Sequence, residues 1–454
     1  MNGMIFEAIQ SHAPEKTALQ DAARSVCYGD LVKEVDKRAQ KLENVSVLGI
    51  ALDNGVEWVL WDLAALKAGV PCVPLPPFFT QDQVFHVLRR AGVSHLVSSE
   101  GINATGISLA GQLPEGTAKI TFTSGTTAEP KGVCLPKAAM ENVASSIVSV
   151  LGGEFVGTHA CLLPLSVLLE NVAGVYAGLM AGCTVRLAGL QDIGASYGNV
   201  HNCLKGATSA ICVPEILRIL MGQTAAKGPL PDLKFIAVGG AKVDPSLIEK
   251  ARAMGLPVYE GYGLSECASV VSLNTPKEDK PGSAGKLLPH VRACVTEGEI
   301  RIEAPGFLGY IGEKAPQTLS TGDLGEIDGN GFLTVTGRKK NVLITSYGRN
   351  VSPEWVEAAL LAQAPVGQAL VYGDAQAHLS ALIVPSSPEA DIREAVYKAN
   401  AALPDYARIE DFQVVPPFTV EAGTLTGTGR PRRNQILTLY AKETEKDELL
   451  RQAG

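Results

Sequence analysis

One stretch organises this chain: Ile120-Thr121-Phe122-Thr123-Ser124-Gly125-Thr126-Thr127-Ala128-Glu129-Pro130-Lys131-Gly132-Val133. Its apolar and β-branched lead-in predicts a strand, and the hydroxyl-bearing residues and glycine that follow predict a loop. The backbone N–H groups and hydroxyls of such a loop can wrap an anion, and Lys131 adds a mobile positive charge. The spacing differs from the P-loop pattern G-x-x-x-x-G-K-[ST], so an ordinary Walker nucleotide triphosphatase is not indicated. Taken alone, the stretch is more typical of a surface hairpin turn.

Length and composition indicate a globular protein of more than one domain. With 454 residues the chain is too long for one ordinary core, and hydrophobic residues make up 46% and charged residues 19% of it. The net charge of -8 and the isoelectric point near 5.5 give no electrostatic reason to expect nucleic acid or an anionic membrane as a partner. No apolar run reaches roughly 18 residues without a charge or a glycine, so we expect no membrane span.

The cysteines and the first residues bear on the compartment. The chain holds nine cysteines, with no C-x-x-C pair, which is typical of thiols in a reducing compartment and not of a disulfide framework. The first residues lack the basic and apolar regions of a signal peptide. We therefore expect a cytoplasmic protein.

Strands alternate with helices over most of the chain, which predicts a parallel sheet with helices on both faces. The expected strands are 45–52, 71–75, 95–97, 160–163, 184–187, 210–213, 235–238 and 258–263. The expected helices are 57–67, 83–91, 138–151, 172–181 and 215–221. Glycines follow three of the expected strands, at Gly125, at Gly239-Gly240 and from Gly261 to Gly263. Ligands of open α/β sheets bind at the carboxyl ends of strands, so these junctions predict one shared crevice.

The pattern changes from residue 297 onward. Short alternating strands at 299–302 and 331–335, with Asp328-Gly329-Asn330-Gly331 between them, predict an antiparallel β module. A charged break follows at 337–341. The last segment predicts an α+β fold, with strands 342–344, 368–372 and 379–384 and helices 352–362 and 392–402. We therefore predict a large domain over residues 1–338 and a small one over residues 339–454.

Three further clusters could carry chemistry, although each has an ordinary alternative. In Tyr262-Gly263-Leu264-Ser265-Glu266 the aromatic ring could stack on a nucleobase and the carboxylate could bind Mg²⁺, or the segment could be a turn with a solvated glutamate. Asp323 could accept hydrogen bonds from ribose hydroxyls or form an Asx turn. Arg338, beside Lys339 and Lys340, could belong to a solvated run of charges.

Taken together, these motifs resemble those of the adenylate-forming superfamily, which holds acyl-CoA synthetases, luciferases and the adenylation domains of peptide synthetases. The matching stretches, in the superfamily's order, are Thr123–Gly132, Tyr262–Glu266, Thr321–Asp323, Gly337–Lys340 and Gly348–Glu354. The resemblance implies an α/β fold with a large N-terminal domain of parallel α/β sheets and an antiparallel β module, plus a small mobile α+β C-terminal domain. It also implies ATP, Mg²⁺ and coenzyme A as cofactors.

Most of the residue roles that the resemblance implies concern binding of the nucleotide. The β- and γ-phosphates of ATP would be held by Thr123, Ser124, Gly125, Thr126, Thr127 and Lys131. The adenine would be lined by Gly239, Gly240 and Ala241 and covered by Tyr262, which is followed by Gly263. Ser265 would contact the α-phosphate and Glu266 would bind Mg²⁺.

The remaining roles fall on the later part of the chain. Asp323 would bind the ribose hydroxyls, and Arg338 the ribose and a phosphate. Lys340 would stand at the hinge between the domains. Gly348 would lie beside the tunnel that admits the pantetheine arm.

The chain departs from the superfamily pattern at three positions. Ala128 stands in the place of a second loop glycine. Val167 replaces the histidine that normally ends the motif beginning at Leu163, whereas Glu170 keeps the form of the long-chain fatty acyl subgroup. Arg430 occupies the place of the adenylation lysine. Because arginine keeps the charge and can grip phosphate oxygens bidentately, we hypothesise that Arg430 takes over that role; alternatively, its segment is a disordered basic tail.

The resemblance implies an enzyme that activates a carboxylic acid with ATP to an acyl-adenylate, releases pyrophosphate and passes the acyl group to coenzyme A. The expected pocket walls, which are Leu162–Glu170, Val213-Pro214, Gly239–Ala241 and Val270, carry no obvious cation, so a fatty or aryl acid is expected. One alternative is a ligase that loads the phosphopantetheine arm of a carrier protein. A second is a non-catalytic nucleotide- or acyl-binding regulator.

Overall fold

The computed structural model describes residues 3–107, 113–123, 130–194, 197–426 and 429–440. The chain divides into two compact units. The first comprises residues 1–123, 129–321 and 325–335, and the second comprises 124–128, 322–324 and 336–454. The domain boundary predicted between residues 338 and 339 stays a prediction; the division by contacts assigns residues 336–338 to the second unit.

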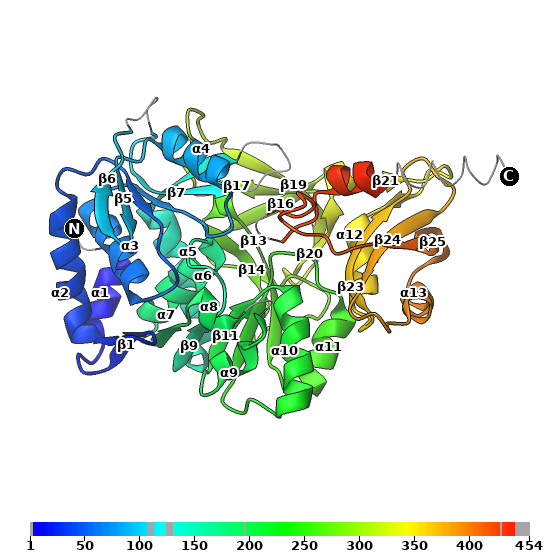
Figure 1. Cartoon of the computed structure of the whole chain (residues 1–454), viewed down its shortest axis with the longest axis horizontal. Coiled ribbons are helices and arrows are strands. Elements are labelled where there is room, and N and C mark those ends of the chain that lie inside the picture. The colour runs from blue at the N-terminus through cyan, green and yellow to red at the C-terminus, as the bar shows by residue number, and fades with distance from the viewer. Residues whose placement is uncertain (1–2, 108–112, 124–129, 195–196, 427–428, 441–454) are drawn as a thin grey trace. The chain divides into compact units, whose positions relative to one another are not determined.

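A nine-stranded sheet runs through the first unit (Figure 1). In spatial order its strands are β15 (Lys286–Leu287), β14 (Ser269–Leu273), β13 (Val258–Leu264), β12 (Phe235–Val238), β11 (Ser209–Cys212), β9 (Thr158–Cys161), β10 (Thr184–Leu187), β1 (Thr17–Gln20) and β2 (Ser25–Cys27). The six strands from β13 to β1 pair in parallel, and β2, β14 and β15 pair antiparallel at the two edges. The parallel α/β core predicted from the strand–helix alternation is confirmed.

A seven-stranded sheet also belongs to the first unit. Its order is β18 (Gly309–Tyr310), β8 (Lys131–Pro136), β7 (Thr117–Thr123), β4 (Cys72–Pro74), β3 (Leu48–Ile50), β5 (His95–Ser98) and β6 (Gly101–Ala104). Strands β7 and β8 pair antiparallel, with Thr123 opposite Lys131. The strand expected from the lead-in is therefore confirmed as β7, whereas residues 124–129, where the turn is expected, lie outside the described residues.

Helices connect these strands, as βαβ units require. Those of the first unit are α1 (Met4–Ser11), α2 (Tyr28–Ala39), α3 (Val56–Ala68), α4 (Gln81–Ala91), α5 (Lys137–Leu151), α6 (Leu168–Glu170), α7 (Ala177–Met180), α8 (Leu190–Ile193), α9 (Val200–Leu204), α10 (Pro214–Lys227) and α11 (Pro245–Ala253). Helix α10 runs past the predicted end at residue 221 because buried Leu217, Leu220 and Thr224 continue its inner face. The predicted helix 172–181 begins instead as a π-helix, η3 (Asn171–Tyr176).

A four-stranded sheet contains β16 (Arg292–Thr296), β17 (Glu299–Glu303), β19 (Thr318–Ile327) and β20 (Leu333–Arg338), in that order. Strands β16 and β17 pair antiparallel, in accord with the predicted β module. Strand β20 includes Gly337 and Arg338, and the predicted charged break is confined to the 3-10 turn η6 (Lys339–Asn341).

The second unit is built from α+β elements, as predicted. A short hairpin pairs β21 (Leu343–Ile344) with β22 (Asn350–Val351), and a three-stranded sheet has the order β23 (Val366–Tyr372), β24 (Leu379–Pro385), β25 (Ile409–Val414). Helices α12 (Pro353–Leu361) and α13 (Ile392–Ala401) share one hydrophobic core with the three-stranded sheet. Helix α12 begins with a proline at its first position, where the missing N–H costs no hydrogen bond.

A buried charged pair stands in the core of the first unit, beside the hairpin. The Nζ atom of Lys119, on β7, lies 2.8 Å from Oδ1 of Asp62, on α3, and the two side chains are 1% and 0% exposed. The other carboxylate oxygen accepts hydrogen bonds from the hydroxyl of Tyr176 at 2.7 Å and from Nδ2 of Asn171 at 3.0 Å. The pair therefore links β7 and α3 to the π-helix, and burial and the nearby Asp62 raise the pKa of Tyr176.

Two expectations about the whole chain concern its cysteines and its hydropathy. All nine cysteines are free thiols. Within the part of the chain that the structure describes, no helix has both the length and the apolar character needed to cross a membrane.

Candidate active site

Two residues predicted to bind phosphate lie at the facing ends of β7 and β8. Thr123 ends β7 and Lys131 begins β8, directly opposite it. The loop residues between them that carry predicted roles, Ser124, Gly125, Thr126 and Thr127, lie outside the described residues, as does Ala128. Of this group, the structure therefore describes the side chain of Lys131 alone.

The glycines after β12 lie against the next strand junction. A Cβ atom added to Gly239 would lie 2.8 Å from the carbonyl oxygen of Gly261, so only glycine lets the two backbones approach this closely. Gly240 has a φ of +85° and turns the chain toward Ala241. Because β12 and β13 are parallel neighbours, their carboxyl ends meet at one edge of the sheet. Two of the three glycine-bearing junctions are thus brought together as predicted, and the third, at Gly125, is outside the described residues.

The motif from Tyr262 to Glu266 forms a sharp reversal between two strands. A Cβ atom on Gly263 would collide with the carbonyl oxygen of Ser269 on β14. Ser265 and Glu266 stand on the 3-10 turn η5 (Ser265–Cys267), and the next two residues, Ala268 and Ser269, have φ angles of +57° and +139°. Positive φ at non-glycine residues costs free energy and is concentrated at functional sites. The Tyr262 ring is partly buried against the apolar cluster that contains Cys267.

Tyr310 brings two predicted site residues together, and the motifs alone did not indicate it. Its hydroxyl donates a hydrogen bond of 2.8 Å to Oε1 of Glu266. Its ring centroid lies 5.0 Å from Nζ of Lys131, which also lies 3.9 Å from Oε1 of Glu313. Burial and the hydrogen bond to Glu266 raise the pKa of Tyr310, so it stays protonated and donates. The sequence signal was a Gly-Tyr pair in a short strand, which is too common a pattern to mark a site.

This arrangement fits a magnesium ion and phosphate groups. Mg²⁺ prefers oxygen ligands and usually takes only one or two carboxylates from the protein. Glu266 offers such a carboxylate, already oriented by a hydroxyl, and Lys131 supplies the cation that suits phosphate. Glu266 would hold the ion, and Lys131 would bind the phosphates.

Glu260, which directly precedes Gly261, is an acidic residue that the motifs did not indicate. Burial raises the pKa of its carboxyl to about 8, although the charge of Lys242 and a hydrogen bond from the backbone of Val243 act in the opposite direction. At neutral pH this side chain is therefore largely protonated, so it adds little negative charge to the edge of the sheet.

The second unit contains the other predicted nucleotide ligands. The Nε atom of Arg338 lies 2.6 Å from Oδ1 of Asp323, whose side chain is 3% exposed. The structure thus pairs the two residues expected to hold the ribose. Lys340 follows on the turn η6 and is exposed.

Two further predicted residues of this unit stand in turns. Gly348 closes a turn in which its N–H donates to the carbonyl of Thr345 at 2.8 Å, and its φ of +71° explains the glycine. The exposed Arg430 lies in a segment where its own carbonyl accepts a hydrogen bond from the backbone of Thr426 and its N–H donates to that threonine's hydroxyl at 3.0 Å. The segment around Arg430 is therefore hydrogen-bonded, contrary to the alternative of a disordered tail, although residues 427–428 are outside the described residues.

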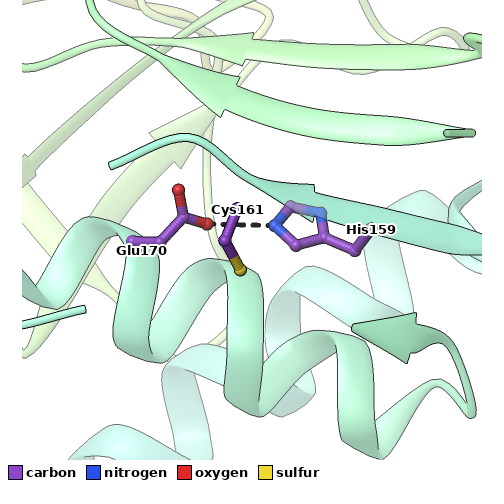
Figure 2. A group of neighbouring side chains, drawn as sticks. All are labelled: His159, Cys161 and Glu170. Atoms are coloured by element: carbon purple, nitrogen blue, oxygen red, sulfur yellow. Dashed lines mark hydrogen bonds and ion pairs between the residues drawn. The ribbon is translucent and has the colours of Figure 1, made fainter. Parts of the chain in front are cut away.

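A buried network holds the chain that follows β9, and Figure 2 shows the His159–Glu170 contact within it. Nε2 of His159 lies 3.0 Å from Oε1 of Glu170, and Nδ1 of the same ring lies 3.0 Å from Oγ of Ser209. The other oxygen of Glu170 accepts the N–H groups of Leu162 and Leu163 at 3.0 and 2.9 Å. Glu170, expected from the motif to line the acid pocket, is fully buried, and here it ties down the start of that wall.

The same group of side chains could be read as a metal site. Potential ligand atoms of His159, Cys161 and Glu170 lie within 4.8 Å of one another. However, both oxygens of Glu170 and both ring nitrogens of His159 already have hydrogen-bonding partners, and burial raises the pKa of the Cys161 thiol well above its ordinary value. Because a metal requires a thiolate, the network is better explained by hydrogen bonding alone.

Comparison with protein families gives two matches. The model described as AMP-binding enzyme matches residues 6–114 and 110–318, and the model described as AMP-binding enzyme C-terminal domain matches residues 340–447. Together the two models cover most of the chain.

Individual relatives extend the comparison. A long-chain-fatty-acid–CoA ligase of Mycobacterium bovis is 32% identical over 46% of this chain and 40% of its own length. A 2-succinylbenzoate–CoA ligase of Bacillus cereus is 26% identical over 87% of this chain and 90% of its own. The O-succinylbenzoate coenzyme A synthetase of Bacillus subtilis, solved with ATP and magnesium ion, superposes with a TM-score of 0.76 at 23% identity, covering 95% of this chain and 98% of that one. At that identity the structural likeness establishes the fold, and it confirms the predicted α/β architecture.

Proposed function

The chain belongs to the AMP-binding enzyme family, and from this premise we propose that it activates a carboxylic acid with ATP and transfers the acyl group to coenzyme A. The observation that carries the proposal is that one side chain of the first unit, Tyr310, contacts both Glu266 and Lys131. A cation and a carboxylate that contact the same tyrosine suit a polyphosphate with its Mg²⁺. The relatives named as CoA ligases support the choice of acceptor.

In the first step, a carboxylate oxygen of the acid attacks the α-phosphorus of ATP, and the bond to the bridging oxygen breaks so that pyrophosphate leaves. The attack is opposed by the negative oxygens that surround the phosphorus. Lys131 would neutralise charge on the departing pyrophosphate, and Ser265 would donate to an α-phosphate oxygen. Mg²⁺ supplies positive charge for the same purpose when bound.

In the second step, the thiol sulfur of coenzyme A loses its proton to solvent and attacks the acyl carbon, and AMP leaves with the electron pair of the broken bond. Asp323 and Arg338 would hold the ribose and phosphate of the nucleotide through the reaction. Gly348 would border the path of the pantetheine arm, and Lys340 would serve as the hinge residue for a rotation of the small domain. Arg430 would act in the first step, in the place of the family's lysine.

The acid is proposed to be apolar, either fatty or aryl. Leu162, Leu163, Leu165 and Val270, which belong to the expected walls, are all buried. Val167 adds a further apolar side chain where the family pattern has histidine. One screen tests both the reaction and the class: ATP–pyrophosphate exchange measured with a panel of fatty, aryl and amino acids. We expect exchange with an apolar acid and none without acid.

Two other functions remain as outcomes of further measurements. Transfer to the phosphopantetheine arm of a carrier protein, tested beside free coenzyme A, would identify a carrier-loading ligase. Binding of ATP without acid-dependent AMP release would identify a non-catalytic regulator. The paired Asp323–Arg338 and Tyr310–Glu266 contacts favour turnover, because a binding protein has no need for an oriented metal carboxylate. We place the reaction in the cytoplasm, where nine free thiols would stay reduced.

A further inference from the structure

We propose that Tyr310 is a positioning residue that holds the Glu266 carboxylate and the Lys131 ammonium with one side chain, so that metal binding and phosphate binding are prepared together. This inference rests on the proposed function, because it concerns the Mg²⁺ and phosphate groups of ATP. Nothing in the motifs that identify the nucleotide site includes this tyrosine.

The backbone at Tyr310 is held firmly against the hairpin. Strand β18 pairs antiparallel with β8, which places Tyr310 opposite Val133. On either side of it the N–H of Leu308 donates to Cys134 at 2.8 Å and the N–H of Ile311 donates to Gly132 at 3.0 Å. A Cβ atom added to Gly132 would lie 2.6 Å from Cδ1 of Ile311, so a side chain there would require the Ile311 side chain to shift. The ring is therefore carried on the same sheet edge as Lys131.

The Tyr310 ring contacts an aromatic ring and a cation. The Phe307 ring packs edge-on against it, with centroids 5.5 Å apart, and Phe307 is buried. The Lys131 ammonium lies 5.0 Å from the Tyr310 centroid, within the range in which a cation is attracted by an aromatic face. Lys131 is otherwise more than half exposed, so this contact limits where its long side chain can go.

The hydroxyl of Tyr310 holds the Glu266 carboxylate. A carboxylate only accepts hydrogen bonds, so the phenol donates to Oε1 of Glu266, and the partner's charge strengthens the bond. Residues that hydrogen-bond a metal-binding carboxylate orient it, and removing them typically lowers metal affinity by about 10- to 100-fold. Because tyrosine is neutral, it can engage both the carboxylate and the ammonium without cancelling the charge of either.

The two contacts can be separated by substitution. Tyr310→Phe keeps the ring under Lys131 but removes the donor to Glu266, and Tyr310→Leu removes both. Tyr397→Phe, on the exposed face of α13, is the matched control. The measurement is calorimetric binding of ATP to the full-length protein over a series of Mg²⁺ concentrations and in the presence of chelator, together with the melting temperature of each variant.

For Tyr310→Phe we expect the Mg²⁺ concentration at half-saturation to rise about tenfold, with ATP binding in chelator unchanged. For Tyr310→Leu we expect the same rise and, in addition, weaker binding in chelator. Adding Tyr310→Phe to Glu266→Gln should have no further effect, because the tyrosine acts through that carboxylate. Wild-type Mg²⁺ dependence in Tyr310→Phe, or an equal loss in the Glu266→Gln background, would overturn the inference. Failure of the wild-type protein to bind ATP at any Mg²⁺ concentration would instead overturn the proposed function.

Discussion

His159 and Glu170 form a fully buried pair, with Nε2 of the histidine 3.0 Å from Oε1 of the glutamate. The pair does more than satisfy two polar side chains. The second oxygen of Glu170 accepts two backbone N–H groups from the chain that leaves β9, at Leu162 and Leu163. Because β9 and β11 are parallel neighbours in the sheet, that chain leaves at the same sheet edge as the segment after β11. This buried network therefore holds the start of the wall proposed for the acid.

Glu170→Ala should lower the free energy of unfolding by about 3–5 kcal/mol, since it leaves the His159 ring and two backbone N–H groups buried without their acceptor. Urea denaturation measures this change. The control is Glu249→Ala, an exposed glutamate on α11, which should stay within about 0.5 kcal/mol of wild type. A Glu170→Ala protein as stable as the control variant would show that the network does not hold the fold.

The buried Asp62–Lys119 pair predicts a test by double substitution. Asp62→Leu alone should lower stability by about 3–5 kcal/mol, because the Lys119 ammonium would lose its counter-charge in the core. Adding Lys119→Met should recover part of the loss, since two apolar side chains of similar size then replace the pair. Urea unfolding of the two single variants and the double variant gives the coupling. Additive losses would mean that the two charges do not stabilise one another.

Glu260 predicts a dependence of stability on pH. Its folded pKa of about 8 lies above the value of about 4.3 expected in the unfolded chain. Between these two values the unfolded chain releases a proton that the folded chain keeps, so unfolding becomes more favourable as pH rises. The contribution of Glu260 to stability is thus highest below about pH 4 and decreases until about pH 8.

Glu260→Gln should remove this dependence. Its stability relative to wild type should increase steadily between about pH 5 and about pH 8, as measured by urea unfolding at several pH values. Glu249→Gln is the exposed counterpart and should show no such trend. If the difference between Glu260→Gln and wild type is constant with pH, the carboxyl is not held protonated in the folded protein.

Removal of the Arg430 side chain is expected to slow the adenylation step and not the transfer to coenzyme A. Arg430→Ala should slow ATP–pyrophosphate exchange by about 10²- to 10³-fold, the usual effect of losing one preorganised charge at a developing anion. Transfer to coenzyme A from a supplied acyl-adenylate should change little. Arg430→Lys should keep most of the exchange, and it is the control for the charge alone. Equal exchange in wild type and Arg430→Ala would exclude the role.

Local patterns predicted most of the secondary structure near the site. The apolar strand 235–238 and the helix ending at Gly69 are where periodicity and glycine placed them. The antiparallel strands β14 and β18 and the hairpin partner β8 were missed. Such strands are recognised only through the neighbour with which they pair, and Gly309-Tyr310 is too short to show a period.

The sequence by itself determined the family, the order of its motifs and the residue types at each expected ligand position. Those properties follow from neighbouring residues, because a glycine, a lysine or a carboxylate carries its chemistry wherever the chain places it. Only the tertiary structure decided that Tyr310 meets Glu266, 44 residues away, and that His159 meets Glu170. Contacts of this kind arise from strand order and from how the elements pack on one another, which the local pattern of residues does not specify.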